Sequence, residues 1–130
     1  MVALSRTLHA LIVDDDRCVG TAVGSVLEAS GHHTVYAQSR EEALCIVRRF
    51  PVDFGIVDVH VRADDGLQIV GSLRAIVRGL PVIMMSGEFT PEIIGRAHDL
   101  GAHHCLEKPL DLGILRQSVR HLIEVERLRC

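Results

Sequence analysis

Short apolar runs alternate with longer amphipathic segments along the whole chain. The apolar or β-branched runs predict strands at residues 8–13, 34–37, 54–59, 82–85 and, as the weakest of the five, 105–107. The first, third and fourth runs are nearly all apolar, which is typical of strands covered on both faces. Each run is followed by a segment whose apolar residues recur at helical spacing. The alternation predicts an α/β protein of five βα units on a parallel, doubly wound sheet.

Capping signals predict where the helices begin and end. The second helix, over about residues 40–50, begins behind Ser39 with Glu42 at the capping-box position and stops at Pro51. Gly31 is expected to be the C′ glycine of the first helix. The expected N-caps of the third, fourth and fifth helices are Asp65, Thr90 and Asp111.

A length of 130 residues fits one domain, in which residues from about 124 to 130 extend the last helix or begin a linker. The formal charge of -3 is not gathered into blocks, so no direct nucleic-acid partner is expected. No stretch reaches the roughly 18 apolar residues of a membrane helix, and no signal peptide is recognised. The four cysteines form no C-x-x-C pair, which suits free thiols. We therefore expect a cytoplasmic protein without a membrane partner.

Polar residues follow the predicted strands at the point where each strand ends. Asp14 and Asp15 follow the first strand and Asp58 lies at the end of the third, while Ser86 and Lys108 follow the fourth and fifth. The carboxyl ends of parallel strands meet at one edge of a sheet, so we expect these side chains to converge. Two unpaired carboxylates about 4 Å apart repel by about 4 kcal/mol at an effective dielectric near 20. A positive group must therefore lie among them.

The residue types at this edge indicate phosphoryl chemistry at a magnesium site. Carboxylates combined with waters and phosphate are the ligands that Mg²⁺ prefers, and the set lacks the soft ligands of zinc. An aspartate can attack phosphorus while a lysine and a hydroxyl bind the transferred oxygens, and Asp58 is the expected acceptor because it ends the central strand.

Asp16 is better explained as a helix cap or a solvated carboxylate than as an outer-shell metal residue. Adjacent strand residues point to opposite faces, so the histidine pairs at 32–33 and 103–104 are not expected to share a metal.

Five stretches of the sequence match one known family. They are LIVDDD, GHHTVYAQSREEAL, PVDFGIVDVHVRADDG, PVIMMSG and GAHHCLEKP. Over essentially its full length the chain resembles the receiver domains of two-component response regulators. Five matching stretches, in the family's order and at its spacing, are together specific for that family. The resemblance implies the flavodoxin-like fold, with a five-stranded parallel sheet in the order 2-1-3-4-5.

The resemblance also implies roles for individual residues. The implied magnesium ligands are Asp14, Asp15, Asp58 and the backbone carbonyl of His60. Asp58 would accept a phosphoryl group from the phosphohistidine of a histidine kinase or a histidine phosphotransfer protein. Ser86 and Lys108 would contact that group, and the Lys108-Pro109 peptide is expected to be cis, against roughly 5–6% of X-Pro bonds in general.

Several positions depart from the family's pattern. Cys105 stands where an aromatic residue usually precedes the lysine, so we expect the signal to pass through the loop after Ser86 and the fourth helix rather than through a coupled serine/aromatic switch. Arg62 replaces a proline, which leaves the loop after the acceptor less rigid and adds a charge. The family tunes the phosphoryl lifetime at two positions that are His60 and Glu88 here, and this pair predicts an unusual autodephosphorylation rate.

The favoured function is a phosphorylation-dependent switch whose only turnover is its own phosphorylation and dephosphorylation. The partner surface is expected on the fourth helix, the fifth strand and the fifth helix, where a downstream effector domain or protein, or a second phosphorylated copy, would bind. A phosphorylation-independent interaction module is the alternative, and its binding would not respond to Asp58→Asn. A magnesium-dependent phosphatase is disfavoured because that class commonly has an aspartate two residues after its nucleophile, where this chain has His60.

Overall fold

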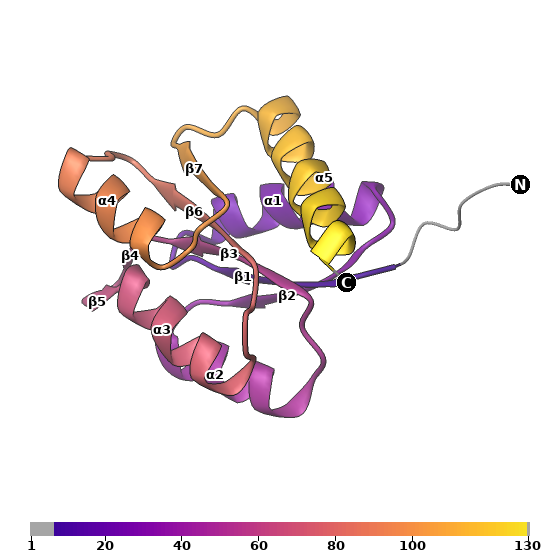
Figure 1. Cartoon of the computed structure of the whole chain (residues 1–130), viewed down its shortest axis with the longest axis horizontal. Coiled ribbons are helices and arrows are strands. Elements are labelled where there is room, and N and C mark those ends of the chain that lie inside the picture. Colours follow the sequence, from indigo (N-terminus) through magenta and orange to yellow (C-terminus); the bar gives the residue numbers. More distant parts are fainter. Residues whose placement is uncertain (1–6, 130) are drawn as a thin grey trace, which may run out of the picture.

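Five parallel strands form the central sheet of the computed structural model, which describes residues 7–129 and the side chains as far as residue 126. The strands are β1 (His9–Val13), β2 (His33–Ala37), β3 (Phe54–Asp58), β6 (Val82–Ser86) and β7 (His104–Glu107). Their order is β2-β1-β3-β6-β7, so the predicted flavodoxin-like order is confirmed with β6 and β7 as the fourth and fifth strands (Figure 1). Each strand begins and ends within one residue of its predicted bounds.

Helices cover both faces of this sheet (Figure 1). They are α1 (Arg17–Ala29), α2 (Arg40–Arg49), α3 (Gly66–Ile76), α4 (Pro91–Asp99) and α5 (Leu112–Arg129). On one face α1 and α5 contribute Leu27 and Leu115 to a buried core, and on the other α2, α3 and α4 contribute Leu44, Leu73 and Ala97 to a second core. Successive strand residues point to opposite faces, which is why β3 and β6 are buried at every position. The α5 backbone continues through the predicted extension to Arg129.

The predicted caps are confirmed at the ends of the helices. The side chains that accept hydrogen bonds from the first turn of a helix are Asp16, Ser39, Asp65, Thr90 and Asp111. At the end of α1, Gly31 has a φ of 90°, its N–H donates to the carbonyl of Glu28, and the N–H of His32 donates to the carbonyl of Leu27. This pattern is a Schellman motif, and it needs the left-handed conformation that glycine adopts without strain.

A short hairpin between β3 and α3 is absent from the predicted elements. It pairs β4 (His60–Val61) with β5 (Asp64–Asp65) in antiparallel orientation. Its turn contains Arg62 with a φ of 58°, an uncommon conformation for a residue other than glycine. Two-residue strands are too short to show a period of alternating residues, so no sequence signal predicts them.

Three cysteines, Cys18, Cys45 and Cys105, are exposed free thiols, as predicted, while Cys130 lies outside the described residues. In the part of the chain that the structure describes, none of the helices has the length and apolar character needed to cross a membrane.

The first residue of α3, Gly66, packs directly against the end of β3. A Cβ atom at this position would overlap the carbonyl oxygen of Asp58, and the Gly66 N–H donates to the carbonyl of Val59 at 2.6 Å. The glycine therefore allows α3 to begin in contact with the strand that carries Asp58.

We expect Gly66→Ala to lower the free energy of unfolding by about 2–4 kcal/mol, because backbone must move to admit the methyl group. Gly71→Ala is the matched control within the same helix, since a Cβ atom there meets nothing within 4 Å. That control should be neutral or stabilising by up to about 1 kcal/mol through helix propensity. Urea denaturation measures both, and equal effects of the two substitutions would contradict the proposed close contact.

Candidate functional site

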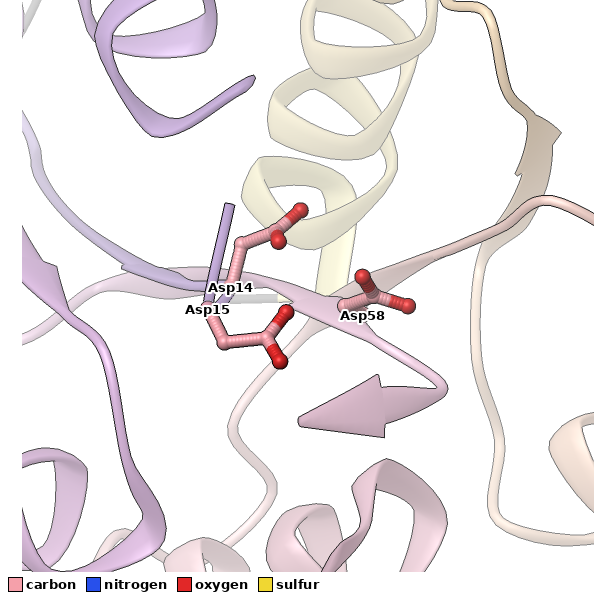
Figure 2. A group of neighbouring side chains, drawn as sticks. All are labelled: Asp14, Asp15 and Asp58. Carbon is pink, nitrogen blue, oxygen red and sulfur yellow. The ribbon is translucent and has the colours of Figure 1, made fainter. Parts of the chain in front are cut away.

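Three carboxylates meet at the carboxyl edge of the sheet (Figure 2). Asp14 and Asp15 directly follow β1, and Asp58 is the last residue of β3, the strand that pairs with β1. Each residue offers a carboxylate oxygen, and these oxygens lie within 4.8 Å of one another. Asp14 and Asp58 are buried, while Asp15 is exposed. The cluster is therefore accessible from the side of Asp15.

Lys108 supplies the positive group that the sequence requires among these carboxylates. Its Nζ atom donates to Asp14 Oδ2 at 2.8 Å and to Asp58 Oδ2 at 2.6 Å. The residue directly follows β7, and the Lys108-Pro109 peptide is cis, as the family resemblance implies. Three carboxylates and one ammonium leave a formal charge of -2 at the cluster. That charge matches a divalent cation.

Burial and pairing act in opposite directions on the charges of this cluster. Burial raises the pKa of Asp14 above its ordinary value of 3.8, and the nearby charge of Asp58 raises it further, against the lowering by Lys108 and by the N–H of Asp16. Burial alone would lower the pKa of Lys108, but its hydrogen bonds to Asp14 and Asp58 raise it overall. Lys108 is therefore a firmly charged ammonium at neutral pH.

A backbone N–H donates to one oxygen of each carboxylate. The N–H of Asp16 donates to Asp14 Oδ1 at 2.8 Å, and that of His60 donates to Asp58 Oδ1 at 3.0 Å. The third donor is the N–H of Arg62, 2.9 Å from Asp15 Oδ2. These donors fix the directions of the carboxylates before any ligand binds.

Ser86 is the last residue of β6, the strand that pairs with β3, and Glu88 lies two residues further along the chain. Ser86 is fully buried, and its hydroxyl donates to the carbonyl of Glu88 at 2.8 Å and accepts from the N–H of the same residue at 3.2 Å. The carbonyl of Ser86 accepts from the N–H of Lys108 at 2.8 Å. His60 and Glu88 are both exposed. The structure therefore brings Asp14, Asp15, Asp58 and Lys108 into contact and places the Ser86 hydroxyl against the next loop.

Tyr36 belongs to this site although it is not among the predicted site residues. Its hydroxyl donates to the backbone carbonyl of Asp14 at 2.6 Å, and its ring lies where a Cβ atom on Gly20 would stand. Burial, followed by the charge of Asp14, raises the pKa of the Tyr36 hydroxyl. A contact between a side chain of β2 and the end of β1 leaves no local sequence signal, because it depends on the register Ile12↔Tyr36.

The set of ligand atoms suits a hard divalent cation. Carboxylate oxygens are the ligands that Mg²⁺ and Ca²⁺ take, and the open side at Asp15 leaves room for water or a phosphate oxygen. The fold and this acidic edge thus define the class: a doubly wound α/β protein with an acidic pocket at the carboxyl ends of its strands. Residues 10–120 match the family described as the response regulator receiver domain, and the chain belongs to that family.

Curated relatives agree with this membership, and a solved structure shares the fold. The chain is 30% identical over 119 residues to the transcriptional regulatory protein GlrR of Escherichia coli strain K12, covering 92% of this chain and 27% of that protein. It is 27% identical to sporulation initiation phosphotransferase F of Bacillus subtilis, covering 89% of this chain and 94% of that protein. A Burkholderia pseudomallei response regulator structure with a phosphorylated aspartic acid, a calcium ion and citrate has a TM-score of 0.80 and 22% identity, covering 95% of this chain and 73% of that one.

The raised pKa of Asp14 predicts how stability depends on pH. The folded protein binds the proton of the Asp14 carboxyl group more tightly than the unfolded chain does, so protonated Asp14 contributes favourably to the free energy of unfolding. This contribution is complete below pH 3.8 and is lost as the pH rises through the pKa of Asp14 in the folded protein. We expect Asp14→Asn to remove this loss and to raise the free energy of unfolding at pH 7 above that of wild type. The difference from wild type should vanish towards pH 3.

Asp16→Asn is the control for this prediction, because asparagine caps a helix as well as aspartate does. Urea denaturation between pH 3 and pH 8 measures all three proteins. An Asp14→Asn variant that is less stable than wild type at pH 7 would overturn the assignment of Asp14 as a strained buried charge.

Proposed function

We propose that the chain is a phosphorylatable switch in which Asp58 accepts a phosphoryl group, with Mg²⁺ bound beside it. One observation carries the proposal: Asp58 lies buried at the end of the central strand, paired with Lys108 and within 4.8 Å of two further carboxylates. An ordinary surface ion pair would need neither the burial nor the second and third carboxylates. A phosphorylated switch needs all of them, because a cation, a nucleophile and a counter-charge must share one pocket.

The chain's own residues would divide the work of the transfer. A carboxylate oxygen of Asp58 forms a bond to phosphorus as the phosphorus–nitrogen bond of a phosphohistidine breaks, and the departing imidazole nitrogen takes up a proton. Asp14, Asp15 and the carbonyl of His60 would hold the Mg²⁺, which supplies charge neutralisation at the phosphoryl oxygens when it is bound. Lys108 already contacts Asp58 and would follow the new charge onto the phosphoryl group.

Ser86 connects the pocket to a surface. Its hydroxyl bonds to the backbone of Glu88, in the loop that leads to Pro91 and α4. A phosphoryl group on Asp58 would compete for this hydroxyl as a stronger acceptor. Release of the Glu88 backbone would then shift the loop and α4, so that phosphorylation changes the population of surface states.

Two similar proteins support this proposal. The Burkholderia pseudomallei structure holds a phosphorylated aspartic acid and a calcium ion, and the Bacillus subtilis relative is a phosphotransferase of about the same length. The chain spans only 27% of the Escherichia coli regulator, which is a transcriptional regulatory protein. We propose a histidine kinase or a histidine phosphotransfer protein as phosphodonor, and an effector domain or protein at the surface of α4, β7 and α5 as output, in the cytoplasm.

Phosphorylation by acetyl phosphate tests the proposal directly. We expect wild-type protein to gain the mass of one phosphoryl group in the presence of Mg²⁺ and to gain none after chelation. Asp58→Asn should gain none under either condition, whereas Asp53→Asn, at the opposite end of β3, should behave as wild type. Tyr36 is the only tyrosine and the chain has no tryptophan, so tyrosine fluorescence reports on the carbonyl of Asp14 during Mg²⁺ titration.

Two results would contradict this function. Labelling that persists in Asp58→Asn would place the phosphoryl group elsewhere. An absence of Mg²⁺-dependent labelling in wild type, together with partner binding that ignores Asp58→Asn, would instead favour the phosphorylation-independent interaction module.

The exposed pair His60 and Glu88 predicts the lifetime of the phosphoryl group. Both side chains lie next to backbone groups that contact the site, and both can orient or repel an attacking water. We expect His60→Asn and Glu88→Ala each to change the half-life of the phosphorylated protein several-fold, measured by the decay of the phosphorylated mass after removal of acetyl phosphate. Glu92→Ala, in the first turn of α4, is the control. Unchanged half-lives in both variants would remove these residues from the dephosphorylation step.

A further inference from the structure

Two histidine rings meet on the opposite side of β7 from α4, away from the acidic pocket. His104 Nε2 lies 3.1 Å from His121 Nδ1, and the ring centroids are 5.2 Å apart with the planes at 71°. His104 comes from β7, the edge strand of the sheet, and is partly buried, while His121 comes from α5 and is exposed. The sequence analysis considers His104 only with its neighbour His103 and so does not find this pair.

The backbone on both sides of the pair is held by the core. β7 is paired with β6, where His104 stands opposite Ile83. The next residue of α5 after His121 is Leu122, which is 1% exposed and belongs to the core that α1 and α5 cover. Both rings therefore project from rigid elements, and little conformational entropy is lost when a shared ligand binds them.

The two nitrogen atoms are close enough to share either one proton or one metal ion. Two nitrogens that each lie 2.0–2.1 Å from a tetrahedral ion are about 3.3–3.4 Å apart. Small rotations of the two rings, which lengthen the distance between the nitrogens by a few tenths of an ångström, would therefore allow both to bind one ion. Imidazole suits Zn²⁺, Cu²⁺ and Ni²⁺ and does not suit Mg²⁺. Burial, and then the neighbouring His121 and His103, lower the pKa of His104, so its ring is neutral at pH 7.

We propose that His104 and His121 form a second metal site, which takes a divalent transition-metal ion through His104 Nε2 and His121 Nδ1. Within the described side chains, the aspartate cluster is the only group of three or more metal-binding residues that lie close together. The histidine site therefore has two protein ligands, and water fills the remaining positions from the exposed side. A bound ion would cross-link β7 to α5 through His104, which lies four residues before Lys108 in the sequence.

Titration of the untagged chain with Ni²⁺ tests this site. We expect calorimetry to show one ion per chain at the histidine pair beside the ion in the acidic pocket. In Asp58→Asn, which weakens the pocket, Tm should rise by about 5 °C when free Ni²⁺ is ten times the dissociation constant of the histidine pair. His104→Ala and His121→Ala should each weaken Ni²⁺ binding at least about tenfold, because each removes one of two protein ligands. Asp58→Asn should weaken Ni²⁺ binding at the acidic pocket and leave the ion at the histidine pair unchanged, so the outcome for the histidine site is independent of the proposed phosphorylation.

His33→Ala is the matched control, because the rings of His33 and His9 form a second histidine contact among the described residues, with their centroids 5.1 Å apart. It should bind Ni²⁺ as wild type does. Paramagnetic broadening of the His104 and His121 ring signals by Ni²⁺ in the wild-type protein tests the site without any substitution. Unchanged affinity in both alanine variants, broadening of other histidines alone, or one ion per two chains would overturn the proposal.

Discussion

The ammonium of Lys108 between the carboxylates of Asp14 and Asp58 is the contact on which the functional edge depends. Three strands must end at the same edge of the sheet for this contact to form, because Asp14 follows β1, Asp58 ends β3 and Lys108 follows β7. Without it, two buried carboxylates would face each other at a cost of several kcal/mol. The parallel topology and the site chemistry are therefore parts of one arrangement.

This arrangement retains unfavourable charge. Lys108 neutralises one of the three negative charges, and burial still raises the pKa of Asp14. The backbone N–H groups of Asp16, His60 and Arg62 compensate in part, and two of these donors come from the hairpin that precedes α3. A site that is strained when it holds only protein groups gains most from a cation or a phosphoryl group, so the same charges that reduce stability favour ligand binding.

Much of the fold could be predicted because its signals are local. The strands were bounded to within one residue, since buried strands such as β3 and β6 are continuous apolar runs ended by polar residues. The helix ends were found through side chains that bond to their own first turn, such as Asp65 and Thr90. The hairpin at residues 60–65 is not predictable in this way, because two-residue strands show no repeating pattern, and the Arg62 N–H at its turn bonds to Asp15, 47 residues earlier in the chain.

Local sequence patterns suffice to predict the order of strands and helices and the polar residues that end the strands, because burial and capping depend on neighbouring positions in the chain. The family resemblance that identifies Asp58 and Lys108 is also present in the sequence alone. Three contacts depend on the packed fold: Lys108 binds both Asp14 and Asp58, Tyr36 donates to the carbonyl of Asp14, and His104 contacts His121. These contacts join residues 17 or more positions apart, so strand register and helix packing, which no local pattern encodes, bring them together.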